Sequence, residues 1–136
     1  MDLALSPRRT VGDHPKGGPT RVERNLLGLL AGLIVALTAA DHWSTYVCLT
    51  EVVPGWQASE ANPLAAWLFG AFGLVPGLAI DTAVTLTAVG MLLRTRLVPA
   101  RAKGACLLLL VVTTGFAVIN NVDALATLGI TPFGRG

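Results

Sequence analysis

The chain has 136 residues, of which 53% are hydrophobic and 13% are charged, and its formal net charge is +2 at pH 7. Soluble domains usually contain about 25% charged residues, and a chain of this length could not bury so much apolar surface away from water. The composition therefore excludes an ordinary soluble domain and favours an integral membrane protein.

Residues 1–24 are rich in Pro and Gly and include five Lys or Arg residues. They have no apolar periodicity, so we expect a disordered, basic tail. The pair Arg8-Arg9 hints at a twin-arginine export signal, but it lies too far before the first apolar run for that signal.

The first apolar run extends from Asn25 to about Cys48, with the core "LLGLLAGLIVALTAA". Because a helix rises about 1.5 Å per residue and must cross roughly 30 Å of hydrocarbon, a span needs about 20 residues. The run reaches this length only if Asp41 and His42 lie inside it. A cleavable signal peptide ending at "TAA" is the alternative, but apolar residues resume after His42. The spacing of Gly28 and Gly32 predicts close helix packing.

A short helix is predicted to begin at Pro63, capped by Asn62, and to end at about Leu74 before the turn pair Pro76-Gly77. Its roughly 12 residues would cover only about 18 Å, which is too short to cross. Two later runs, at about 76–93 and 104–128, are long enough to span. We therefore expect a transmembrane helical domain over 25–130 and a short tail over 131–136.

Nine of the ten Lys and Arg residues lie in the first tail or at 94–103. Basic residues mark the cytoplasmic side of a membrane, and both clusters are cytoplasmic if two crossings separate them. We therefore predict an all-α, polytopic bundle of three spanning helices in the inner (plasma) membrane, with a cytoplasmic N-terminus and an extracytoplasmic C-terminus. The short helix would be re-entrant or interfacial on the outer side. Four spans are the alternative, which would place one basic cluster outside.

Several polar residues of different runs fall at one depth, about 20–30 Å above the cytoplasmic boundary when residues are counted from the basic clusters. A charge in a span costs about 2.5–3.5 kcal/mol on insertion scales, so such residues usually face a bundle interior or water. We therefore predict an outer-leaflet polar pocket that holds a proton, a cation or a cationic ligand. Its predicted residues are Asp41, Thr45, Glu60, Asn62, Asp81, Asn120 and Asp123.

Helical spacing places these residues on polar stripes. The stripes are Thr38, Asp41 and Thr45 on the first run, Asp81 and Thr85 on the third, and Thr113, Asn120, Asp123 and Thr127 on the last.

Simpler roles compete with this interpretation. Asp81 and Asp123 could be solvated at the ends of their spans, and Asn120 and Asn121 could only join helices through hydrogen bonds. His42 is one position round the helix from Asp41, and a lone histidine there is more often interfacial than a ligand.

The segments "DHWST" and "EANPL" resemble the signature of an uncharacterised prokaryotic family of small multi-span membrane proteins, a domain of unknown function. That signature has an Asp, a Thr four residues later, and then Glu-x-Asn-Pro-Leu. The matching residues are Asp41, Thr45, Glu60, Asn62, Pro63 and Leu64, and the similarity covers about residues 25–95. The resemblance implies a lysine at about the position of Asp81. An Asp there makes a bound cation or proton more necessary. The resemblance implies no activity.

Three functions follow as hypotheses: a non-enzymatic membrane protein with this pocket, a structural or assembly subunit of a larger membrane complex, and an intramembrane hydrolase. In the hydrolase, Asp41, His42 and Glu60 would activate water, but the sequence has no His-Glu-x-x-His or Gly-x-Ser-x-Gly motif. We therefore favour a non-enzymatic function over an enzymatic one.

No cofactor motif is evident, and a bound cation is the one added group that the acids suggest. The expected partners are the lipid bilayer and either further copies of the chain or a larger membrane complex. We expect no nucleic-acid binding, because attraction to anionic lipid accounts for the juxtamembrane basic residues.

Overall fold

The computed structural model describes residues 20–56 and 59–131. The four helices are α1 (Arg21–Thr50), α2 (Pro63–Phe72), α3 (Leu74–Arg94) and α4 (Ala100–Thr127). Three of them, α1, α3 and α4, are long and apolar enough to cross a membrane. With ten residues, α2 covers about 15 Å and cannot cross. The predicted all-α bundle with three long apolar helices and one short apolar helix is confirmed, and no fourth helix of the described residues is long enough to span.

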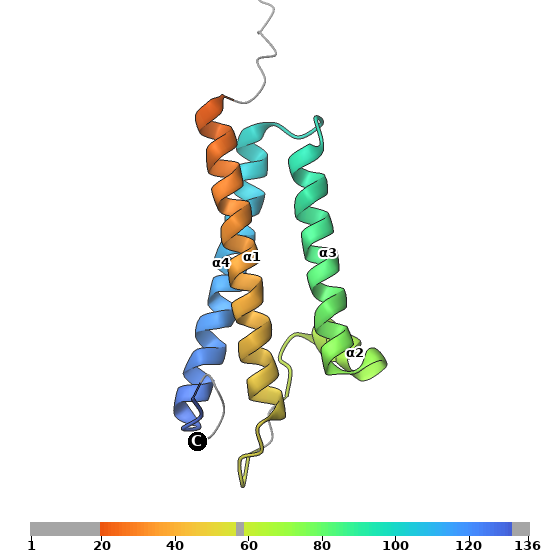
Figure 1. Cartoon of the computed structure of the whole chain (residues 1–136), viewed down its shortest axis with the longest axis vertical. Coiled ribbons are helices and arrows are strands. Elements are labelled where there is room, and N and C mark those ends of the chain that lie inside the picture. Colours follow the sequence, from red (N-terminus) through yellow and green to blue (C-terminus); the bar gives the residue numbers. More distant parts are fainter. Residues whose placement is uncertain (1–19, 57–58, 132–136) are drawn as a thin grey trace, which may run out of the picture.

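The three long helices run side by side, and α2 folds back beside the start of α3 (Figure 1). The most extensive packing is between α1 and α4, whereas α3 touches α4 least. One apolar cluster, built on Ile34, Val89 and Leu107, joins all three long helices. Many other large apolar side chains are exposed. An exposed apolar surface is what helices in a bilayer present to acyl chains.

The first helix begins four residues earlier than the sequence analysis placed its boundary. Thr20 and Glu23 form a capping box, in which Thr20 Oγ1 accepts from the Glu23 N–H at 3.2 Å and Glu23 Oε2 accepts from the Thr20 N–H at 2.8 Å. This reciprocal pair satisfies two N–H groups that a helix start otherwise leaves open. Residues 21–24 therefore belong to α1. The rest of the predicted tail, with Arg8-Arg9, lies outside the described residues, as do residues 132–136.

Gly73, and not the pair Pro76-Gly77, separates the second and third helices. Gly73 has a φ of +87°, which an L side chain rarely adopts, and its N–H still donates to Phe69 O at 2.9 Å. Pro76 lies in the first turn of α3, where a missing N–H costs nothing. Gly77 is buried against α2, since a Cβ there would come within 2.6 Å of Phe69 Cδ1. This close approach lets α2 fold back along α3.

One further expectation about the long helices was wrong. The last helix begins at Ala100 and not near Gly104, so that the loop between α3 and α4 is short. The close packing predicted at Gly28 and Gly32 is not formed among the described residues of this chain, and its formation with another chain stays a prediction. No heavy atom outside the local helix backbone lies within 4 Å of a Cβ built at either glycine.

Replacing Gly77 with alanine should weaken the packing of α2 on α3. The new methyl group would clash with the Phe69 ring, and such overpacking typically costs about 1–3 kcal/mol. Gly90→Ala on the same helix is the matched control, because nothing lies within 4 Å of its Cβ position. Thermal unfolding in detergent, followed by circular dichroism, should show a lower Tm for Gly77→Ala alone. Equal Tm values for the two variants would contradict the packing described here.

Candidate functional site

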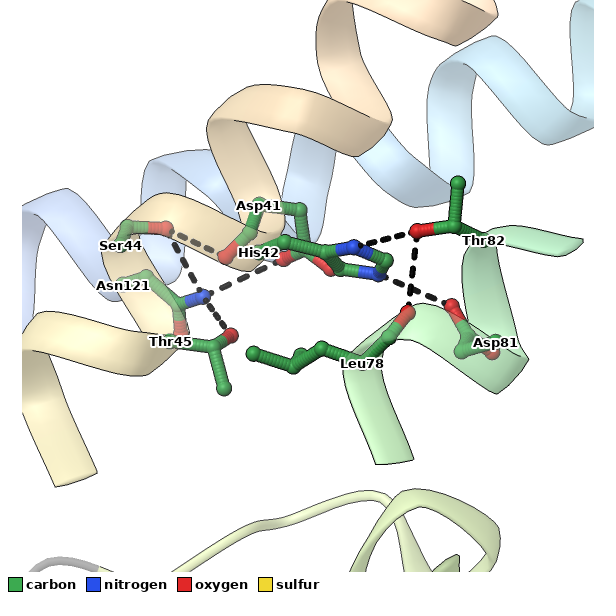
Figure 2. Close-up of polar contacts among 8 residues, drawn as sticks. All are labelled: Asp41, His42, Ser44, Thr45, Leu78, Asp81, Thr82 and Asn121. Carbon is green, nitrogen blue, oxygen red and sulfur yellow. Dashed lines mark hydrogen bonds and ion pairs between the residues drawn. The ribbon is translucent and has the colours of Figure 1, made fainter. Parts of the chain in front are cut away.

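Two neighbouring residues of α1, Asp41 and His42, face different helices (Figure 2). Asp41 is bonded to α4 through Asn121, whereas His42 is bonded to α3 through Asp81 and Thr82. An α-helix has 3.6 residues per turn, so consecutive side chains point about 100° apart. One turn of α1 therefore connects both of the other spanning helices.

The contact between α1 and α4 centres on the side-chain amide of Asn121. Its Nδ2 donates to Asp41 Oδ1 at 3.2 Å, to Ser44 Oγ at 3.2 Å and to Thr45 Oγ1 at 3.0 Å. An amide has two N–H hydrogens, so these three acceptors share two donors. Ser44 and Thr45 are buried, and each buried polar side-chain atom among the described residues has a partner. Ser44 Oγ already donates to Asp41 O at 3.0 Å within α1, so the amide adds a partner from α4 to hydroxyl groups that are buried in this contact.

The contact between α1 and α3 is formed by the imidazole of His42. Its Nε2 lies 3.0 Å from Asp81 Oδ2, and its Nδ1 lies 2.9 Å from Thr82 Oγ1, which is also 2.9 Å from Leu78 O. An ionised carboxylate only accepts hydrogen bonds, so Nε2 carries a proton. A neutral ring then accepts from Thr82 at Nδ1. A protonated ring donates to Thr82, whose own hydrogen goes to Leu78 O. Thr82 can therefore serve both charge states of the ring.

A partly open pocket of about 250 Å³ lies between these contacts. Three carboxyl groups line it, from Asp41, Glu60 and Asp81, together with the aromatic rings of Phe69 and Phe116. The side chain of His42 is 16% exposed and that of Asp81 is 44% exposed, so the carboxyl group is the more open member of the pair. Its free surface can therefore meet a bound molecule.

The segment before α2 brings Glu60 to this pocket. Glu60 Oε1 accepts from the N–H of Asn62 at 2.8 Å, and Asn62 Oδ1 accepts from the N–H of Leu64 at 3.0 Å. Asn62 is the N-cap of α2 and Pro63 its first residue, as predicted. These local turns fix the direction of the chain at the rim of the pocket.

Six of the seven predicted site residues line this pocket. They are Asp41, Thr45, Glu60, Asn62, Asp81 and Asn120. Asp123 is exposed and is not among the lining residues. All four positions of the predicted stripe on the last helix are exposed, and Asn120 is the member of the stripe that lines the pocket. Asn121, which follows Asn120 in the chain, faces α1.

His42 is bonded more extensively than its sequence pattern predicts, since that pattern favoured an interfacial residue over a ligand. The structure places this ring between α1 and α3 and bonds both of its nitrogens. The adjacent polar residues Asp81 and Thr82 were the available signal, since they lie at a similar depth to His42 on the predicted spans. A histidine facing such a pair has a partner for each ring nitrogen.

The charges around the pocket are unbalanced. Its described lining residues include three carboxyl groups and His42 but no Lys or Arg. With the carboxyl groups ionised, the local charge is −3 when His42 is neutral and −2 when it is protonated. Over residues 20–56 and 59–131, no group of three His, Cys, Asp or Glu side chains is arranged to hold a metal ion. The described lining of the pocket therefore carries an excess of negative charge.

Comparisons of the chain with protein-family models, with curated proteins and with solved structures found no match. The resemblance to the small membrane-protein family therefore stays a prediction, and the functional argument rests on the site itself.

Asn121→Leu should destabilise the bundle more than Asn120→Leu. The first change removes three hydrogen bonds between α4 and α1, whereas Asn120 is exposed and lines the pocket. Hydrogen bonds between membrane helices contribute about 0.6–1.7 kcal/mol, so we expect a loss of about 1–2 kcal/mol. Denaturant unfolding in mixed micelles measures the difference. An equal loss in both variants would show that Asn121 does not hold α1 to α4.

The neutral ring of His42 should carry its proton on Nε2, because Asp81 accepts there. Substituting the only other histidine, in H14Q, isolates the signal. Nitrogen-15 NMR of the labelled imidazole, at a pH where the ring is neutral, distinguishes the two tautomers. Asp81→Asn should reduce the preference, whereas Asp123→Asn should leave it unchanged. A dominant Nδ1–H tautomer in the H14Q protein would contradict the geometry.

Proposed function

We propose that this chain is an integral membrane protein whose acidic pocket binds a small organic cation, such as a protonated amine. The observation that carries the proposal is the set of three carboxyl groups around a pocket of about 250 Å³ with no Lys or Arg among its described lining residues. The three acids are partly exposed, and the mutual repulsion of carboxylates that share a pocket costs free energy when no cation lies between them. A cation in the pocket would offset that cost.

The shape and walls of the pocket favour an organic cation over a metal ion. The acids come from α1, the segment before α2, and α3, and they do not form a metal-binding group among the described residues. Phe69 and Phe116 add ring surfaces, and a cation over an aromatic face gains about 0.5–2 kcal/mol. The volume is below the roughly 300–1,000 Å³ of drug-sized ligands. A small amine fits these limits, and a shared proton or a metal cation is the simpler alternative.

The proposed orientation places the pocket in the outer leaflet of the inner (plasma) membrane. The end of the bundle with Arg94, Arg96 and Arg101 would be cytoplasmic, because basic residues concentrate on that side. Exposed Trp43 and Trp67 lie on the helices that carry the pocket, and such rings favour the membrane–water boundary. The N-terminus would then be cytoplasmic and the C-terminus extracytoplasmic, with α2 interfacial or re-entrant.

A role as a structural or assembly subunit is the second candidate, and one observation favours it. The face of α1 with Gly28 and Gly32 is unused within the described chain, and small residues of this spacing often mark contacts between membrane helices. Another copy of the chain or a larger complex could pack there.

The hydrolase alternative has less support. Thr82 is the hydroxyl nearest to His42, but it is not among the residues that line the pocket.

Glu60→Gln should reduce the binding of methylammonium or tetramethylammonium at least tenfold, measured by isothermal titration calorimetry on the purified chain in detergent. The amide oxygen of glutamine can still accept from the Asn62 N–H, so the variant removes charge and keeps the turn. Asp123→Asn is the charge-matched control, because Asp123 is exposed outside the pocket. It should leave the affinity within twofold.

Two results would count against an organic cation. The first is no binding by the unaltered chain, or equal losses in both variants. The second is Glu60-dependent binding of Na⁺ or Ca²⁺ without binding of either ammonium ion, which would assign the pocket to an inorganic cation.

A further inference from the structure

A second, larger cavity lies at the opposite end of the bundle, between the beginning of α1, the end of α3 and the beginning of α4. Its volume is about 1,110 Å³. Among the described residues that line it, five are basic and one, Glu23, is acidic. The basic residues are Arg24, Arg94, Arg96, Arg101 and Lys103. An excess of positive charge therefore surrounds this space.

Lys103 is a buried basic residue in the wall of this cavity. Its side chain is buried, with the residue only 8% exposed, and Nζ donates to Leu93 O at 2.9 Å and to Thr95 O at 2.6 Å. An ammonium group has three N–H donors, so one is left over. No ion pair joins Lys103 to a carboxylate of the described chain. A buried charge without a counterion is unfavourable, and an anion in the cavity would remove that cost.

The beginning of α4 also favours an anion in this cavity. No side chain caps this helix start, which follows Pro99, and the first backbone N–H groups of a helix attract anions. The cavity also has an apolar wall formed by Leu27, Leu93 and Val98. A free phosphate would leave this wall unused, whereas a lipid would cover it with its glycerol and acyl groups.

We propose that this cavity binds the headgroup of an anionic phospholipid. The phosphate lies beside Lys103 and the start of α4, Arg101 contacts the phosphate oxygens, and the acyl chains follow the apolar wall toward the bilayer. The proposal commits to a lipid because the cavity lies at the ends of helices that are long enough to span a membrane. It does not depend on the acidic pocket.

Native mass spectrometry of the delipidated full chain tests the proposal, with phosphatidylglycerol and phosphatidylcholine of the same acyl composition as probes. Phosphatidylglycerol should bind at least tenfold more tightly. Lys103→Met should lower that affinity at least tenfold, and Arg101→Gln about threefold to tenfold. Arg21→Gln is the matched control, because Arg21 is also exposed in the first turn of a spanning helix but does not line the cavity. It should change the affinity less than twofold.

Three outcomes would overturn the proposal. Equal affinities for the two lipids would remove the charge selectivity, and equal losses in Arg21→Gln and Arg101→Gln would indicate diffuse attraction to the surface. Displacement of phosphatidylglycerol by an equal concentration of glycerol 3-phosphate would assign the site to a soluble phosphate. Arg101→Gln tests the proposal even if Lys103→Met fails to fold, since Arg101 is exposed whereas Lys103 is buried.

Discussion

The arrangement of the bundle depends on the angle between two consecutive side chains of α1. Because Asp41 and His42 point about 100° apart, one turn of this helix meets Asn121 of α4 on one side and Asp81 of α3 on the other. The acidic pocket is the space between these two contacts. Inserting or deleting one residue between Ile34 and Asp41 would leave the spacing of the pair intact, but it would rotate both groups relative to the apolar core around Ile34.

The third helix is held differently from the other two. It packs little against α4 and moderately against α1, and polar side chains of other helices bond to it near both ends. His42 bonds to Asp81 and Thr82 near its start, and Lys103 bonds to the carbonyl groups of Leu93 and Thr95 at its end. In a bilayer, lipid covers apolar surfaces as well as protein does, so specific polar contacts have more influence on helix position. The two candidate binding sites therefore lie where α3 is anchored.

The sequence predicted depth much better than it predicted rotation. Depth depends on counting residues along a helix, and an error of one residue displaces a side chain by about 1.5 Å. The same error turns a side chain by about 100°. For this reason Asn120 was predicted as the site residue, whereas Asn121 is the residue that bonds to α1. Lys103 could not be identified from sequence, because its burial depends on how closely α4 follows α3. Gly73 was missed because Pro76-Gly77 is the stronger turn signal, although proline is also favourable in a first helical turn.

The two roles of Asp81 link the proposed ligand to the helix contact. The same carboxyl group accepts from His42 and lines the pocket, and about 44% of its side chain is exposed. A protonated His42 leaves the three acids with a net charge of −2, and a neutral His42 leaves −3, while Thr82 provides a hydrogen-bond partner in both states. The ring can therefore change charge without losing either contact. The proposed cation near Asp81 and a proton on His42 would neutralise the same charges, so each would weaken the binding of the other, and this linkage would be reciprocal.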